Sequence, residues 1–519
     1  MTINYLCRPK SNMKIPFCSL AKSKFNPYSF SSNLATKATT PKEKSKITLK
    51  ESDLMYLFKK CSNARDVTQL HAQIIRSGQN QTLFVIGKII VFCAVSDQGD
   101  MGYAASVFAN IESPDGFLWN TMIRGFSKNC KPVKAFEYYK IMQENGFLSD
   151  NFTLSFLLKA CGQLGSVVLG QQMHCSALKH GLHSHEFVRS ALIHMYGMVT
   201  DIETASQLFE EIPEPELVAW NIIIDCHVGC GKYKEALNLF LRMFTSGIEP
   251  DEATILVTLS ACSALGALDS GRWVHSCVDG TRLNGITTVS NSLINMYAKC
   301  GAVEEAFELF NKMKGKNIIS WNTMILALAT HGHAKEALAL FEKMFRDNLE
   351  RPDDVTFLGV LCACSHGGMV DEGRRYFDIM CKEYHIKPTI RHYGCMVDIL
   401  SRAGFVEEAY QLIRSMPMES NAIVWRTQLA ACQLHGKVEL GEKAWRYLSE
   451  LEPDHSSDYV VLANMYASAG QWNEVQRVRK SMQDMGIQKS EPGKSFIGTD
   501  LDKMSDLGYV KTCPHQGRQ

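Results

Sequence analysis

Polar side chains recur along this chain at intervals that would suit hydrogen-bond recognition. Three asparagines each follow a tryptophan, and the intervals between them are both 101 residues (221 − 120 and 322 − 221): Asn120, Asn221 and Asn322. An aspartate stands at the end of each corresponding segment: Asp150, Asp251 and Asp353. An asparagine amide presents donors and an acceptor together, and a nearby carboxylate can orient it. The spacing predicts one recognition element repeated along an extended surface.

Whole segments repeat with these residues. The same shift carries Ala160-Cys161 onto Ala261-Cys262 and Met195-Tyr196 onto Met296-Tyr297. Self-similarity at a fixed period is the signature of repeat architectures, which stack into elongated solenoids with concave binding surfaces. Because 519 residues exceed what one hydrophobic core supports, stacked units also suit the length.

Each 101-residue block divides into units of 35, 35 and 31 residues, and each unit is expected to form a helical hairpin. In the unit 217–251, Ala236, Phe240 and Met243 fall on one helical face. Gly247 and Pro250 follow as a stop signal. The units 116–150 and 318–353 repeat the pattern. We therefore predict an all-α fold, a right-handed α-solenoid of helix-turn-helix repeats.

Composition predicts a folded chain without a membrane span. Hydrophobic residues make up 45% and charged residues 21%, which is ordinary for a globular protein. The most apolar stretch, Phe84–Val95, is interrupted by Lys88 and is too short to cross a bilayer.

The first residues form a basic arm. Residues 1–50 hold ten Lys or Arg and the single acid Glu43, so the remainder of a chain of net charge +1 carries −8 (1 − 9). The arm is rich in Ser and Thr, which predicts a disordered organelle transit peptide over 1–47. A basic tail without a targeting role is the alternative. The composition separates mitochondrion from chloroplast poorly, and the mitochondrion is the expectation.

The cysteines indicate packing and not catalysis or metal binding. Several of the 18 follow an alanine in equivalent repeat positions: Cys161, Cys262, Cys364 and Cys432. No Cys-x-x-Cys occurs, so we expect buried structural thiols, no metal ligands and no cofactor. Phosphate-loop, nucleophile-elbow and dinucleotide motifs are missing too, and no catalytic residue is predicted. The run His183-Ser184-His185-Glu186 is expected to be a solvated turn.

The hairpins resemble plant pentatricopeptide repeats of the kind that alternates P, L and S units. P units read 116–150, 217–251 and 318–353; L units read 151–185, 252–286 and 354–389; S units read 186–216, 287–317 and 390–421. A degenerate L and S pair precedes them at 48–115, and two E-type units follow at 422–490. The segment 491–519 is expected to be a poorly ordered tail. The cytidine-deaminase motifs that end some relatives are missing.

This resemblance implies binding of single-stranded organellar RNA at one base per unit. In the family, Asn with Asp favours uracil, so the three P units would read U. Asn291 with Asn317 would read C or U. Apolar residues three positions before the reading asparagines would flank the bases: Phe117, Val218 and Ile319. Other units have pairs that specify little.

The resemblance implies a monomer that specifies a C-to-U editing site, with a deaminase recruited in trans through residues 422–490. Splicing, processing or stabilisation of RNA is the alternative within that class. A protein-binding scaffold of tetratricopeptide type is the alternative outside it. The net charge of −8 is unusual for a nucleic-acid binder and counts against the RNA interpretation. For the asparagines themselves, helix N-capping is the structural alternative.

Overall fold

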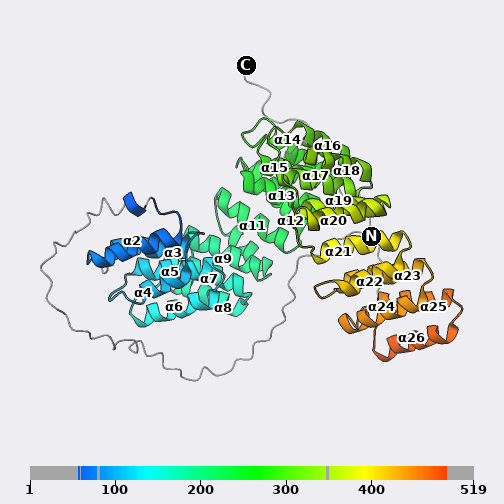
Figure 1. The fold of residues 1–519 in the computed structure, drawn as a ribbon. Helices are drawn as coiled ribbons and strands as arrows, with labels where there is room; N and C mark the ends of the chain where they lie inside the picture. The colour runs from blue at the N-terminus through cyan, green and yellow to red at the C-terminus, as the bar shows by residue number, and fades with distance from the viewer. Residues whose placement is uncertain (1–55, 59, 79–81, 347–349, 488–519) are drawn as a thin grey trace, which may run out of the picture. The chain divides into compact units, whose positions relative to one another are not determined.

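The computed structural model describes residues 56–58, 60–78, 82–346 and 350–487. The predicted transit peptide 1–47 and tail 491–519 lie outside these residues. In the described ranges all regular secondary structure is helical, with the main helices numbered α2 to α26, most of which Figure 1 labels. None of these helices has the length and apolar character that crossing a bilayer requires.

The chain divides into two compact units, Met1–Val85 and Ile86–Gln519. The first unit contains α2 (Ala64–Arg76), where Asn63 caps the helix by accepting from the Asp66 amide. Helix α3 (Leu83–Val95) crosses the division, and all later helices belong to the second unit.

The second unit is a series of helical hairpins that follow α4 (Met101–Phe108). Their first helices are α5 (Gly116–Lys128), α7 (Asn151–Leu164), α9 (Glu186–Met198), α11 (Leu217–Gly229), α13 (Glu252–Leu265), α15 (Thr287–Lys299), α17 (Ile318–Thr330), α19 (Asp354–Gly367), α21 (Ile390–Arg402), α23 (Ala422–Leu434) and α25 (Ser456–Ser468). Their second helices are α6 (Pro132–Glu144), α8 (Val167–Lys179), α10 (Ile202–Glu210), α12 (Tyr233–Thr245), α14 (Leu268–Val278), α16 (Val303–Lys312), α18 (Ala334–Arg346), α20 (Val370–Lys382), α22 (Val406–Ser415), α24 (Val438–Leu451) and α26 (Trp472–Asp484).

First helices pack against one another in an unbroken row from α5 to α25. Each second helix packs on its own first helix and, in every hairpin that has a successor, on the first helix of the next one. The prediction of an all-α solenoid of helix-turn-helix repeats is confirmed. Since the row is continuous, equivalent positions on successive first helices come next to one another.

A tryptophan packs at the junction between hairpins just before each of Asn120, Asn221 and Asn322. Trp119, Trp220 and Trp321 are buried. Each meets a phenylalanine of the preceding second helix edge to face, with ring centroids 4.7, 4.7 and 5.1 Å apart. Such aromatic pairs stabilise beyond the area they bury. The Trp-Asn dipeptide therefore joins a packing residue to a polar one.

The expectation of buried structural thiols is confirmed. Cys161, Cys262, Cys364 and Cys432 have no exposed surface. Burial raises the pKa of each of these thiols to about 12, which keeps them protonated and unreactive.

Candidate nucleic-acid interface

The asparagines predicted to read bases occupy one position in their helices. Asn120, Asn221, Asn291 and Asn322 are each the fifth residue of a first helix, in α5, α11, α15 and α17. We refer to these four side chains as the amide row. The N-caps of the four helices are other residues: Asp115, Glu216, Ile286 and Asn317. The N-capping explanation is therefore wrong for the four asparagines of the amide row.

The aspartates paired with these asparagines, in contrast, are helix N-caps. Asp150, Asp251 and Asp353 are the N-caps of α7, α13 and α19, and each accepts from the backbone amide of the third helical residue at 2.7 to 2.9 Å. That third residue is a threonine in every case: Thr153, Thr254 and Thr356. These threonines escaped the sequence reasoning, although the repeated Asp-x-x-Thr pattern is a capping-box signal that could have identified them.

Each aspartate also binds the amide of the preceding hairpin. The Nδ2 atoms of Asn120, Asn221 and Asn322 donate to the paired carboxylates at 2.9, 3.1 and 2.9 Å. The threonine hydroxyls lie 2.6, 2.5 and 2.6 Å from the corresponding asparagine Oδ1 atoms. The structure thus brings each predicted Asn-Asp pair together and fixes the orientation of the amide.

Hydrogen bonding keeps one of these carboxylates charged. Burial acts to raise the pKa of Asp251, but hydrogen bonds from Thr254 and Asn221 outweigh it, and the pKa lies below its usual value. A charged acceptor orients a donor more strongly than a neutral one.

Each paired amide keeps part of its hydrogen-bonding capacity. One Nδ2 hydrogen and one Oδ1 lone pair are uncommitted after the contacts above. A pyrimidine edge also offers donor and acceptor side by side, so the two edges are complementary. Little of the amide is exposed, however: Asn120 is 8% and Asn322 6% accessible, and Asn221 is half-buried. A ligand could therefore contact only a small part of each of these residues.

The Asn291-Asn317 pair is held less firmly. Nδ2 of Asn291 donates to Oδ1 of Asn317 at 3.3 Å, and Asn317 caps α17 with Ser320 in the threonine position. Ser320 donates to Asn317. Oδ1 of Asn291 is buried without a hydrogen-bond partner in the described residues, so this amide lacks the second restraint that fixes the other three.

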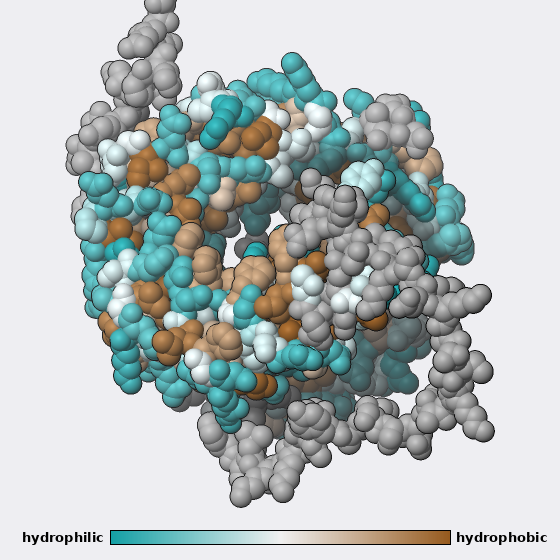
Figure 2. Space-filling view, turned by 90° about the vertical axis from the view of Figure 1, so that its left-hand side faces the viewer, coloured by the Kyte–Doolittle hydropathy of each residue, from teal (hydrophilic) through white to brown (hydrophobic). Residues whose placement is uncertain are grey.

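The predicted flanking residues reach the surface. Phe117, Val218 and Ile319 are second residues of their helices and are 63, 59 and 57% exposed. Exposed apolar side chains recur at the same position in other hairpins: Phe152, Phe187, Val355 and Ile423. Phe152 and Phe187 lie nearly parallel, with centroids 6.3 Å apart. Apolar residues also show at the surface as brown patches among hydrophilic ones in Figure 2.

Positive charge gathers on the first hairpins. The ninth residues of α5 and α7 are Arg124 and Lys159, and both are exposed. The next two ninth residues are His194 and Asp225. Burial lowers the pKa of His194, Asp225 acts to raise it and Lys159 lowers it further, so these side chains are electrostatic neighbours. The ninth position is therefore basic in α5 and α7 and acidic in α11.

The fifth position of α23 holds an ion-paired arginine instead of an asparagine. Arg426, the fifth residue of α23, contacts buried Asp458 at 2.9 Å and Glu452 at 2.6 Å. The same position that holds a hydrogen-bonding amide in P units is here committed to a structural salt bridge.

The remaining sequence candidates have structural explanations. His185 precedes α9 in its N-cap position, and its ring stacks on Phe187 with centroids 5.6 Å apart. Within the described ranges, no group of three or more His, Cys, Asp or Glu side chains is placed to hold a metal ion.

Family models match most of the repeat array. A model described as PPR repeat family matches residues 114–163, 215–264 and 316–366. One described as PPR repeat matches 288–318, 355–385 and 391–420, and one described as E motif matches 435–498.

Several curated relatives are pentatricopeptide repeat-containing proteins of Arabidopsis thaliana. One, named chloroplastic/mitochondrial, is 42% identical over 84% of this chain and 70% of its own length. Another is 38% identical over 89% of this chain and 96% of its own length. A third, named chloroplastic, is 41% identical over 86 and 78%. The crystal structure of the maize repeat protein PPR10 aligns at 18% identity over 85% of this chain and 74% of its own, with a TM-score of 0.47.

Proposed function

This chain belongs to the plant pentatricopeptide repeat family and carries its E motif, and on that premise we propose that it binds single-stranded RNA in a sequence-specific manner. The observation that carries the proposal is the amide row. Three asparagines at one helical position are oriented by a carboxylate and a hydroxyl, and each keeps a donor and an acceptor for a ligand. A row of equivalent amides suits a polymer with one planar polar edge per repeat.

The pyrimidine preference follows from the chemistry of the uncommitted edge. In the proposal, the paired amides of the P units select U, and the looser Asn291 accepts C or U. Phe117, Val218 and Ile319 pack against the base faces, since exposed apolar side chains next to a polar edge suit a flat ring that is polar only at its rim.

The finer proposal is that the protein specifies a C-to-U editing site and recruits a deaminase through residues 422–490. Support comes from the E motif at 435–498 and from Arg426, whose ion pairs remove the fifth position of α23 from base recognition. The E-type hairpins are then available for a protein partner.

We place this function in an organelle, because relatives are named chloroplastic or chloroplastic/mitochondrial. Those names give no support to the expected preference for the mitochondrion.

The Asn322→Thr variant tests the base-reading role. Full-length protein is incubated with a randomised RNA pool, and bound RNA is sequenced for wild type and variant. We expect U at a single position of the selected motif to give way to G, with the other positions unchanged.

The matched control is Asn238→Thr, the same substitution at an exposed second-helix position. It should leave the selected motif as it is. A uniform loss of binding in Asn322→Thr, or an unchanged motif, would contradict base reading. Editing is tested separately, by sequencing organelle transcripts from plants that lack the protein: loss of one edited cytidine supports the finer proposal, and altered splicing or abundance with editing intact contradicts it.

A further inference from the structure

Four junctions between hairpins contain a pair of neighbouring aromatic rings, which we call the aromatic floor. A ring of one second helix meets the tryptophan of the next first helix in the pairs Phe108-Trp119, Phe209-Trp220, Phe310-Trp321 and Tyr410-Trp425. Each floor lies between two successive second helices that have few direct contacts with each other. A side chain of the following second helix can therefore lie on each aromatic pair.

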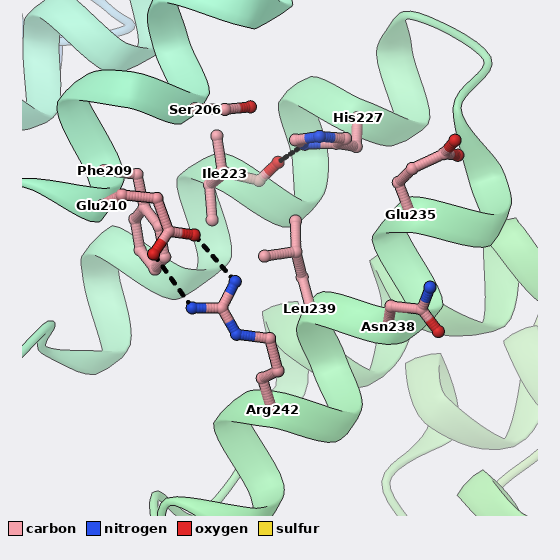
Figure 3. A pocket seen from close by; sticks show the side chains of 9 residues that line it. All are labelled: Ser206, Phe209, Glu210, Ile223, His227, Glu235, Asn238, Leu239 and Arg242. Atoms are coloured by element: carbon pink, nitrogen blue, oxygen red, sulfur yellow. Dashed lines mark hydrogen bonds and ion pairs between the residues drawn. The ribbon is translucent and has the colours of Figure 1, made fainter.

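A large side chain from the following second helix lies on the aromatic pair at three of these junctions. Tyr138 lies 5.7 Å from Phe108 and 6.3 Å from Trp119, between ring centroids. Tyr447 stacks on Trp425 with centroids 4.3 Å apart. Arg242 lies over Trp220 at 5.6 Å, and Figure 3 shows its guanidinium directed at Glu210, with hydrogen bonds of 2.7 and 3.1 Å.

The groove on Phe310 and Trp321 is different. The 101-residue shift places Asn311 where Glu210 stands and Lys343 where Arg242 stands. No carboxylate fixes Lys343 within the described residues. The cavity measures about 610 Å³, against about 230 Å³ at the equivalent Arg242 junction. We call it the Lys343 groove.

The Lys343 groove has an apolar floor and a mainly basic rim. Phe310, Trp321 and Leu340 supply the floor, and Lys314, Lys316 and Lys343 stand around it with one carboxylate, Glu336. The ammonium of Lys316 lies 5.1 Å from the centre of the Phe310 ring. Burial lowers the pKa of Lys316, and the nearby Lys343 lowers it further, so a negative partner would relieve both effects.

We propose that the Lys343 groove docks an acidic segment of a partner protein that carries a bulky apolar side chain. The apolar side chain packs on Trp321 and Leu340, and flanking carboxylates meet Lys314 and Lys343. Charge complementarity and an apolar floor at the centre are the features of a peptide-binding hot spot.

RNA fits the groove less well than an acidic peptide. Phe310 and Trp321 meet at 80°, so the floor is a corner and not a flat platform for a base. No residue of the amide row lines the groove.

The test uses full-length protein and a fluorescein-labelled peptide with a central Phe-Leu pair flanked by Asp and Glu. Fluorescence anisotropy should show saturable binding, weakened about tenfold or more by the double variant Lys314→Glu/Lys343→Glu. Both lysines are exposed, so the variant should fold, as circular dichroism will check. The charge-matched control Lys140→Glu/Lys179→Glu, at exposed second-helix sites elsewhere, should bind like wild type.

Glu210→Asn provides a second control. It gives the Arg242 junction the residue found at Asn311, but Pro213 and Pro215 stand there in place of Lys314 and Lys316, so it should add no peptide site. Three results would overturn the proposal: no saturable binding, equal binding of an acidic peptide with Gly-Gly in place of Phe-Leu, or loss of affinity for single-stranded RNA in Lys314→Glu/Lys343→Glu. The last result would assign the groove to RNA.

Discussion

At the scale of single residues, the threonine three positions after each capping aspartate links two neighbouring hairpins through hydrogen bonds. The Thr356 hydroxyl lies 2.6 Å from Oδ1 of Asn322 and 2.9 Å from Oδ1 of Asp353. Thr356→Val keeps the shape and removes the hydroxyl from a buried site. We expect a loss of about 1–3 kcal/mol in the free energy of unfolding, measured with urea, and weaker selection of U at the Asn322 position.

Thr323→Val is the control for this change. The Thr323 hydroxyl is exposed and bonds only to the Ile319 carbonyl of its own helix, so its removal should alter stability by less than about 0.5 kcal/mol. Equal effects of the two substitutions would show that the bridge to Asn322 contributes nothing specific.

A buried histidine makes stability depend on pH. His392 replaces threonine in the third position of α21: its Nδ1 accepts from the Thr389 backbone amide at 3.1 Å, and its Nε2 bonds to the Asp354 carbonyl at 2.8 Å. Burial lowers its pKa, so the fold favours the neutral ring. A lowered histidine pKa contributes stability that is present above the unfolded pKa of about 6.5 and is lost below it.

We therefore expect urea midpoints to fall between pH 7.5 and pH 5, and to fall less in His392→Gln. Burial also lowers the pKa of His174 and His194, so part of the pH dependence should remain in the variant. An identical pH profile for variant and wild type would exclude His392 as a contributor.

At the scale of helices, the close approach of α9 and α11 depends on a glycine. A Cβ added at Gly197 would lie 2.1 Å from Sγ and 2.6 Å from Cβ of Cys226. One repeat later, the equivalent residues are Ala298 and Ala327. Two methyl groups there replace the pair of a glycine and a cysteine side chain. We expect Gly197→Ala to destabilise the protein by about 1–3 kcal/mol through overpacking, measured by urea unfolding.

The double variant Gly197→Ala/Cys226→Ala should recover most of that loss, because it recreates the pair found at Ala298 and Ala327. The coupling between two substitutions in contact is the quantity to measure. Simple addition of the two single effects would mean that the contact does not set the distance between the helices.

The hairpins were predictable because their signals are local and repeated. The unit 217–251 showed one apolar face and a Gly-Pro stop, and α11 and α12 occupy it. The junctions were not predictable in the same way. Whether a groove is filled depends on pairs such as Glu210 and Arg242, 32 residues apart, and no local pattern reports that pairing. The burial of the amides, too, follows from packing between neighbouring first helices.

At the scale of the whole molecule, the charge distribution bears on how RNA is held. Phosphate contacts from Lys and Arg make affinity fall with salt, at about 0.7 logarithmic units per contact on a single strand. Along the row of first helices, Arg124 and Lys159 give way to Asp225 and, further on, Asp398 at the same ninth position. Phosphate contacts should therefore concentrate on the first two hairpins, with base contacts supplying most of the remaining affinity.

A salt titration tests this division of the affinity between phosphate contacts and base contacts. A plot of log affinity for a cognate RNA against log salt should have a slope no steeper than about −2, whereas one phosphate contact in each of nine repeats would give about −6. Lys159→Glu should make the slope shallower by about 0.7 and weaken all RNA sequences alike, because phosphates carry no sequence information. Lys179→Glu, an equal charge change on the second helix of the same hairpin, should leave the slope unchanged. A steep slope that survives Lys159→Glu would place the phosphate contacts elsewhere on the chain.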